Sequence, residues 1–177
     1  MDRTQTIAVL LPCYNEENTI GKTVLSFKAA LPEASIYVCD NNSSDNTINV
    51  AEESGAIILK ELRQGKGHAV RKMIASVNAD VYVLCDGDNT YDSSSSMDLV
   101  NHLLENKLDM VVASRMESYA TTGYRPGHTF GNRLITSLVN FLFKSSFTDV
   151  LSGYRVMSRR FVKSFPVMSK GFEIGCI

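Results

Sequence analysis

The segment Val81–Asp88 joins an uninterrupted apolar run to two carboxylates, Asp86 and Asp88, which are separated by Gly87. A short run of β-branched, aromatic and aliphatic residues is typical of a parallel strand that is buried on both faces. In open α/β sheets, ligands collect just beyond the carboxyl ends of such strands. The segment therefore predicts a central strand that delivers Asp86 and Asp88 to the mouth of a binding crevice.

The chemistry of this acidic turn suggests what the crevice binds. Gly87 allows the chain to turn after the strand, so that both carboxylates can reach one ion. Oxygen ligands on a short turn suit a hard divalent cation, Mg²⁺ or Mn²⁺, which keeps other coordination positions free for substrate phosphates. The alternative is a solvated acidic turn, because Asp-X-Asp triplets are common where strands end.

The rest of the chain repeats the order of strand, polar turn and helix. Four further apolar runs predict strands at Ile7–Leu11, Ile36–Cys39, Ala56–Leu59 and Met110–Ala113. Caps and apolar stripes predict helices at about 15–31, 47–54, 65–78, 92–105 and 130–143, and a short one from about residue 159. Polar residues follow each strand, so we expect five strands that end at one edge of a mostly parallel sheet.

Three local features add detail to the expected order of strands and helices. Pro12 is expected to end the first strand, and Asn15 to cap the first helix, with acids in its first turn. Near the end of the chain, Ser152–Arg155 is expected to form a polar turn before the last short helix.

Length, charge and cysteine usage limit the possible classes. The chain has 177 residues, of which 44% are hydrophobic, and one domain with a sizeable core is expected. A net charge of −1 gives no electrostatic reason to expect nucleic acid. The four cysteines are too widely spaced to indicate a zinc site or a disulfide framework, which fits a reducing cytosol: Cys13, Cys39, Cys85 and Cys176. No apolar run is long enough for a signal peptide or a membrane span.

Six motifs, taken in order, resemble family 2 glycosyltransferases of the GT-A fold, and most closely the polyprenyl-phosphate and dolichol-phosphate sugar transferases. They are Pro12–Glu16, Asp40–Thr47, Gly65–Gly67, Asp86–Asp88, Ser114–Arg115, and Thr148–Asp149 with Ser152–Arg155. The resemblance implies a Rossmann-like three-layer α/β sandwich with a mostly parallel central sheet. It also implies that residues 1–177 form one catalytic domain, and one that is incomplete after the Phe172–Ile174 motif.

The same resemblance implies a UDP- or GDP-linked sugar as donor, a divalent metal held by Asp86 and Asp88, and an inverting transfer. Asp40 is expected to bind the base or ribose, although Asn41 departs from the common Asp-Asp pair. The alternatives are a capped turn at Asp40–Thr47 and a flexible turn at Gly65–Gly67. The full set of expected donor contacts is Pro12, Tyr14, Glu16, Val38, Asp40, Lys66, Cys85, Asp86, Gly87 and Asp88.

On the acceptor side, the resemblance implies that Arg115, Arg133 and Ser137 hold the phosphate of a polyprenyl phosphate. Residues four apart share one helix face, so Arg133 and Ser137 can bind adjacent oxygens of one phosphate. If the acceptor is instead a sugar hydroxyl, a base must take its proton, and Asp149 is the candidate. The expected catalytic residues are therefore Asp88, Arg115 and Asp149.

Two further interpretations concern turnover and location. The domain could be a truncated nucleotide-sugar-binding module without turnover. A lipid acceptor implies a cytoplasmic protein that is peripheral at the cytosolic face of a membrane, with contact through residues 117–128 and Phe130–Phe147. Aromatic and basic side chains accompany one another there, as suits a bilayer interface, although the aromatics could equally be core.

Overall fold

The computed structural model describes residues 5–113 and 153–164. They form a six-stranded sheet in the order β3-β2-β1-β4-β6-β5. The strands are β1 (Ile7–Cys13), β2 (Ser35–Asp40), β3 (Ile57–Lys60), β4 (Val81–Leu84), β5 (Met110–Val112) and β6 (Arg155–Ser158). The helices are α1 (Ile20–Ala30), α2 (Thr47–Glu53), α3 (Lys66–Ser76), α4 (Ser96–Glu105) and α6 (Arg159–Ser164), with a 3₁₀ turn, η1 (Ser93–Ser95), before α4.

The strand directions confirm a mostly parallel sheet. β1 to β4 are parallel to one another, whereas β6 is antiparallel to both neighbours, β4 and β5. β5 therefore runs in the same direction as the first four strands, and all five expected strands end at one edge. The sixth strand is a correction, because β6 begins at Arg155, within the segment expected to be only a turn.

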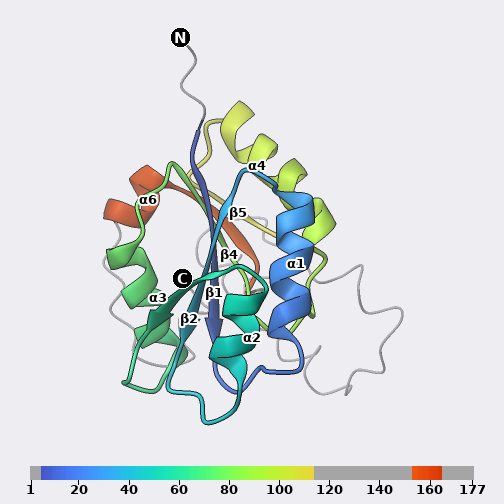
Figure 1. Ribbon diagram of the computed structural model, residues 1–177. Coiled ribbons are helices and arrows are strands. Elements are labelled where there is room, and N and C mark those ends of the chain that lie inside the picture. The colour runs from blue at the N-terminus through green and yellow to red at the C-terminus, as the bar shows by residue number, and fades with distance from the viewer. Residues whose placement is uncertain (1–4, 114–152, 165–177) are drawn as a thin grey trace, which may run out of the picture.

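Two hydrophobic clusters make the molecule a three-layer sandwich. One face of the sheet packs against α1, α2 and α4, and the other against α3 and α6, as Figure 1 shows. β1 contributes alternately to both clusters, with Val9 and Leu11 on the first face and Ala8 and Leu10 on the second. This explains why its sequence is continuously apolar, and the expected α/β sandwich is confirmed.

β1 does not end at Pro12 as expected, because it pairs with β2 as far as Cys13. The backbone hydrogen bonds give the reason. The carbonyl of Leu10 accepts from Cys85 N on the β4 side, and that of Cys13 accepts from Asn41 N on the β2 side. The backbone groups of successive residues point alternately toward β4 and toward β2, so an N–H at position 12 would point toward β4. The last β1–β4 pair is Leu10 with Leu84, so position 12 lies beyond that ladder and the strand tolerates a proline there.

Asn15 does not cap α1 either, since the helix begins at Ile20. Asn15 has a left-handed backbone with φ of 54°, which asparagine tolerates better than most residues. Its N–H donates to Ser43 Oγ at 2.9 Å, and its Oδ1 accepts from Ser44 N at 2.9 Å. Asn15 thus fastens the β1–α1 loop to the β2–α2 loop at the carboxyl edge of the sheet.

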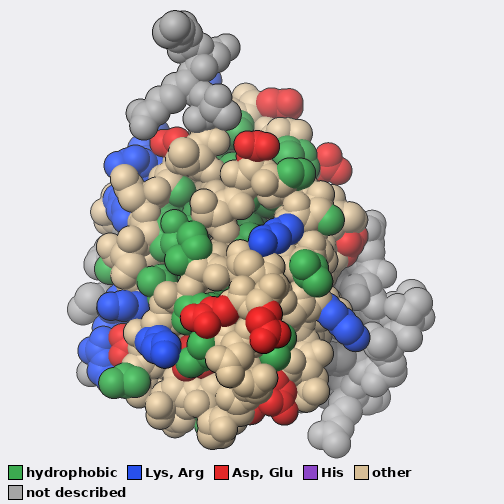
Figure 2. Space-filling model, viewed as in Figure 1, with side chains coloured by type: hydrophobic (Ala, Val, Ile, Leu, Met, Phe, Trp, Pro, Cys, Tyr) green, Lys and Arg blue, Asp and Glu red, His purple; other side chains and the backbone are tan. Residues whose placement is uncertain are grey.

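Charged side chains of both signs lie on the face drawn in Figure 2. Lys and Arg gather over α3 and α6, and acidic side chains gather over α2.

Within the described part of the chain, no helix is both long and apolar enough to cross a bilayer.

Candidate active site

A cavity of about 600 Å³ lies at the carboxyl ends of β1, β2 and β4. Its walls come from the turns after these strands, from the start of α3 and from the residue two before β6. This is the position where parallel α/β sheets bind their ligands. The lining residues are Pro12, Cys13, Tyr14, Glu16, Asn41, Gln64, Gly65, Lys66, Ala69, Asp86, Gly87, Asp88 and Gly153.

The acidic turn after β4 brings Asp86 and Asp88 into this one cavity, as expected. The role of Gly87 differs from the expectation, because its φ is not in the left-handed region. A Cβ at this position would instead overlap the Sγ of Cys13, so the turn needs a residue without a side chain. The carbonyl oxygen of Gly87 accepts a hydrogen bond from Thr23 Oγ1 of α1 at 3.1 Å, which anchors the turn to the core.

Lys66 and Asp86 form an ion pair inside the cavity through Oδ1 of the carboxylate. The second oxygen, Oδ2, faces Gly153, where a Cβ would come within 2.7 Å of it. The charges of the turn also affect a neighbouring thiol: burial, and then Asp86 and Asp88, raise the pKa of Cys85, whereas Lys66 lowers it. The Cys85 thiol is therefore neutral, and the lysine partly offsets the two carboxylates.

The carboxylates fit a hard divalent cation. Asp88 uses Oδ1 to accept hydrogen bonds from Thr90 Oγ1 at 2.6 Å and Thr90 N at 3.1 Å. Asp86 already has a cationic group, the Lys66 ammonium, on one oxygen. Among the described residues no cluster of three or more His, Cys, Asp or Glu side chains surrounds a point. A cation here would therefore take further ligands from water and substrate phosphates, as Mg²⁺ and Mn²⁺ commonly do.

Asn41 fixes the wall of the cavity that carries Lys66. Its side chain is 5% exposed, and its Nδ2 donates to the carbonyl oxygens of Glu61 at 2.9 Å and Arg63 at 2.8 Å. Its Oδ1 accepts from the N–H of Gly65 at 2.7 Å. Gly65 has φ of 127°, which a residue with a side chain rarely adopts. The amide thus holds the β3–α3 loop through two donors and one acceptor.

Three of the expected donor contacts, Pro12, Tyr14 and Glu16, line the cavity. The ring of Tyr14 is half exposed, and Glu16 is held by a hydrogen bond from Thr19 Oγ1 to Oε2 at 2.7 Å. With Lys66, Asp86, Gly87 and Asp88, they account for seven of the ten expected donor residues.

The remaining three, Val38, Asp40 and Cys85, do not line the cavity. The side chains of Val38 and Cys85 are buried in the core on the α1 side of the sheet, which leaves neither free to contact a nucleotide. Asp40 is 4% exposed, and both of its oxygens accept from the N–H of Ser43 at 3.3 Å. Asp40 therefore closes its own turn, as the alternative interpretation of this segment proposed.

Several lining residues were not selected from the sequence: Cys13, Asn41, Gln64, Gly65, Ala69 and Gly153. Gly153 belongs to the last of the six motifs, but its place beside Asp86 depends on β6. Tyr91 helps to hold Gly153 there, because its hydroxyl accepts from the N–H of Gly153 at 2.9 Å. The expected acceptor and catalytic residues Arg115, Arg133, Ser137 and Asp149, and the expected membrane surface of residues 117–128 and 130–147, lie outside the described residues.

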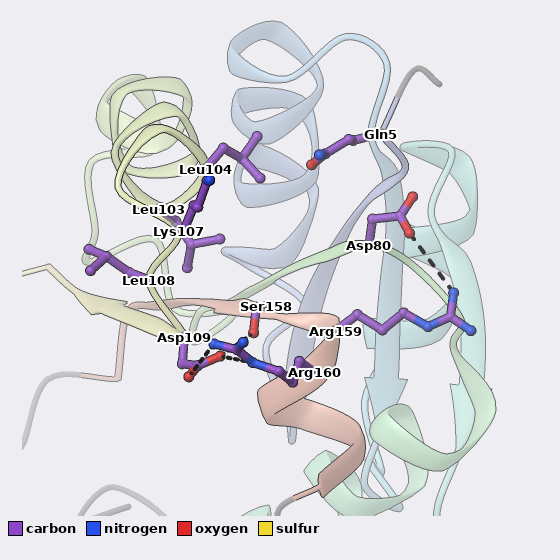
Figure 3. A pocket seen from close by; sticks show the side chains of 10 residues that line it. All are labelled: Gln5, Asp80, Leu103, Leu104, Lys107, Leu108, Asp109, Ser158, Arg159 and Arg160. Carbon is purple, nitrogen blue, oxygen red and sulfur yellow. Dashed lines mark hydrogen bonds and ion pairs between the residues drawn. The ribbon is translucent and has the colours of Figure 1, made fainter. Parts of the chain in front are cut away.

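A second cavity, of about 450 Å³, lies at the opposite edge of the sheet between α4 and the start of α6. Figure 3 shows leucines of α4 on one side and two ion pairs on the other, Arg159 with Asp80 and Arg160 with Asp109. The Arg160–Asp109 pair is bidentate, with distances of 2.9 and 2.8 Å. This second cavity lies away from the carboxyl ends of the parallel strands, where ligands of such sheets bind.

An α/β sandwich with an acidic, lysine-bearing cavity beyond its parallel strands is consistent with a glycosyltransferase domain of the GT-A type, and the comparisons with known proteins support this class. The chain belongs to glycosyl transferase family 2, whose model matches residues 8–165. It is 51% identical over 122 residues to protein RfbJ of Shigella flexneri, covering 69% of this chain and 95% of RfbJ.

Two longer proteins are also similar. The dolichyl-phosphate hexose transferase of Haloferax volcanii is 29% identical, over 86% of this chain and 66% of its own length. The crystal structure of Mycobacterium tuberculosis glucosyl-3-phosphoglycerate synthase with Mn²⁺, uridine-diphosphate and phosphoglyceric acid superposes with a TM-score of 0.77. It is 25% identical, over 98% of this chain and 62% of that one. The chain therefore spans about two thirds of these two proteins.

Proposed function

We propose that this domain transfers a sugar, with inversion, from a nucleotide-diphosphate sugar to a polyprenyl phosphate, with the help of Mg²⁺ or Mn²⁺. The observation that carries the proposal is the convergence of Asp86, Asp88 and Lys66 on one cavity at the carboxyl edge of the sheet. Family membership and the Mn²⁺ and uridine-diphosphate in the solved relative support the donor and the metal.

The donor half of the reaction needs stabilisation of the departing nucleoside diphosphate. Asp86 and Asp88 would hold the divalent cation, which supplies charge stabilisation for the leaving group when it is bound. Lys66 would contact the diphosphate as a point charge, and the half-exposed ring of Tyr14 lies at the cavity where the nucleoside would stack.

The acceptor half rests on the dolichyl-phosphate hexose transferase among the relatives. A phosphate monoester has a second pKa of about 6, so it is already an anionic nucleophile at neutral pH. It needs positioning rather than a general base, and we assign that role to Arg115, Arg133 and Ser137. A lipid acceptor would bring the domain to the cytosolic face of a membrane as a peripheral protein, with residues 117–128 and 130–147 as the contact surface.

Transfer to a hydroxyl is the second candidate, because the solved relative is named as a glucosyl-3-phosphoglycerate synthase. In that case Asp149 would take the proton of the acceptor hydroxyl.

One experiment separates the two candidates. The protein is incubated with a panel of UDP- and GDP-linked sugars and either a short polyprenyl phosphate or phosphoglyceric acid, with Mn²⁺, with Mg²⁺ or with EDTA. We expect metal-dependent formation of a polyprenyl-phosphate sugar. A product with phosphoglyceric acid alone would favour the hydroxyl acceptor. Binding of a nucleotide sugar without any product would identify a binding module instead.

A further inference from the structure

We infer that Lys66 is the internal counter-cation of Asp86. Its ammonium holds this carboxylate when neither metal nor donor is bound, and moves to the donor diphosphate when a metal ion takes the carboxylate. The inference rests on the proposed function and gives Lys66 a defined task within it, which is to couple metal binding to donor binding.

The contact itself is the first observation. Lys66 and Asp86 form an ion pair with side chains that are 20% and 25% exposed, and both line the cavity. The ammonium occupies one carboxylate oxygen, and the other faces Gly153, where the absence of a side chain leaves room. A cation that approaches Asp86 therefore meets a carboxylate that is already neutralised on one side.

The concentration of charge is the second observation. Asp86, Asp88 and Lys66 all line one cavity, and Lys66 is already paired with Asp86. A metal ion alone must displace the ammonium and leave it without a partner. A diphosphate that arrives with the metal gives the ammonium a new anionic partner. Because coupling between two ligands is reciprocal, metal should strengthen nucleotide binding by the same factor by which nucleotide strengthens metal binding.

The backbone of Lys66 is held in place, so only its side chain needs to move between the two anions. Lys66 is the first residue of α3, and the loop before it is held by the hydrogen bonds of Asn41 to Glu61, Arg63 and Gly65. The flexible four-carbon stem of lysine can then swing between two anions from a fixed origin.

The test measures binding rather than turnover. Calorimetry gives the Mn²⁺ affinity alone and in the presence of saturating UDP for the wild type, Lys66→Met, Lys66→Arg and Lys72→Met. Lys72 is an exposed lysine of the same helix and controls for the loss of one positive charge. We expect Lys66→Met to bind Mn²⁺ alone about tenfold more tightly and to lose most of the coupling with UDP. Lys66→Arg and Lys72→Met should retain it.

The outcomes that would overturn the inference are distinct. If Lys66→Met, with an unchanged melting temperature, binds Mn²⁺ alone no more tightly than the wild type, Lys66 is not a competitor of the metal, and the inference fails while the proposed function stands. The same conclusion follows if Lys72→Met behaves like Lys66→Met. If the wild type binds neither Mn²⁺ nor UDP, both the proposed function and the inference fail. Lys66→Gln provides a second neutral variant should Lys66→Met be unstable.

Discussion

The side-chain oxygen of Asn41 accepts a hydrogen bond from the backbone N–H of Gly65 at 2.7 Å, across 24 residues of sequence. This contact joins the end of β2 to the residue that precedes α3. It gives Asn41 a structural role at the position where the sequence departs from the Asp-Asp pair that the resemblance implies. Here the side chain must donate as well as accept, and a carboxylate has no hydrogens to donate.

Replacement of Asn41 by aspartate should therefore loosen the wall of the cavity. Asn41→Asp loses both donors to the carbonyl oxygens of Glu61 and Arg63, and we expect a loss of about 1–3 kcal/mol in the free energy of unfolding. UDP binding should weaken with it, since the loop carries Lys66. Urea denaturation and calorimetry measure the two effects. Asn78→Asp is the matched control, because Asn78 is exposed between α3 and β4. Equal effects in both variants would refute the proposal that the Asn41 side chain holds the β3–α3 loop.

Asp88→Asn tests the metal site while preserving the turn. An asparagine oxygen can still accept the two hydrogen bonds from Thr90, so the fold should be unaffected. The loss of charge should weaken UDP binding in the presence of Mn²⁺ by about 1.5–3 kcal/mol, or roughly tenfold to a hundredfold. Asp98→Asn, on the exposed first turn of α4, should bind normally. Unchanged calorimetric binding by Asp88→Asn would exclude this carboxylate as a ligand.

Gly87→Ala should destabilise the protein through one contact. The added Cβ would overlap Cys13 Sγ, and overpacking of this kind costs about 1–3 kcal/mol. Cys13→Ala removes the sulfur, so the double variant should be more stable than the sum of the two single losses predicts. Urea denaturation of all four proteins completes the double-mutant cycle. Additive losses would mean that Gly87 is needed for another reason.

Glu61 should make stability depend on pH in acid. Hydrogen bonds from Arg63 lower the pKa of Glu61 from 4.5 to about 2. A carboxyl with a lowered pKa in the folded state contributes stability above its unfolded pKa, and that contribution is lost as the pH falls from about 4.5 toward 2. The stability difference between the wild type and Glu61→Gln should shrink from pH 5 to pH 2; a constant difference would contradict this.

Arg133→Ala addresses the acceptor. If Arg133 holds the acceptor phosphate, the variant should bind a short polyprenyl phosphate less tightly by about 2 kcal/mol, because a charged hydrogen-bond partner is lost. Its affinity for UDP with Mn²⁺ should remain unchanged. Titration with each ligand separates these effects, and an equal loss of donor binding would show that Arg133 serves the donor instead.

Local sequence pattern determined the strands that are covered by helices on both faces of the sheet. Apolar runs such as Ile7–Leu11 and Val81–Leu84 have few alternatives to a buried strand, and each polar segment that follows marks the carboxyl edge. For this reason the mostly parallel sheet, its flanking helices and the convergence of Asp86 and Asp88 could be predicted from residues close in sequence. The resemblance to family 2 glycosyltransferases, rather than local pattern, predicts Pro12, Tyr14 and Glu16 at the site, and these residues line the cavity at and just after the end of β1.

Tertiary structure decided the features that depend on distant partners. The four residues of β6 gain their strand conformation from pairing with β4 and β5, and only this pairing brings Gly153 to Asp86. The role of Asn41 in holding the β3–α3 loop becomes visible only in the folded structure, where its three hydrogen bonds to that loop form. Val38 and Cys85 follow the same motif logic as their cavity-lining neighbours, yet the alternation of side chains turns them into the core. Periodicity therefore fixes which residues form an element, whereas packing between elements fixes which side chains meet.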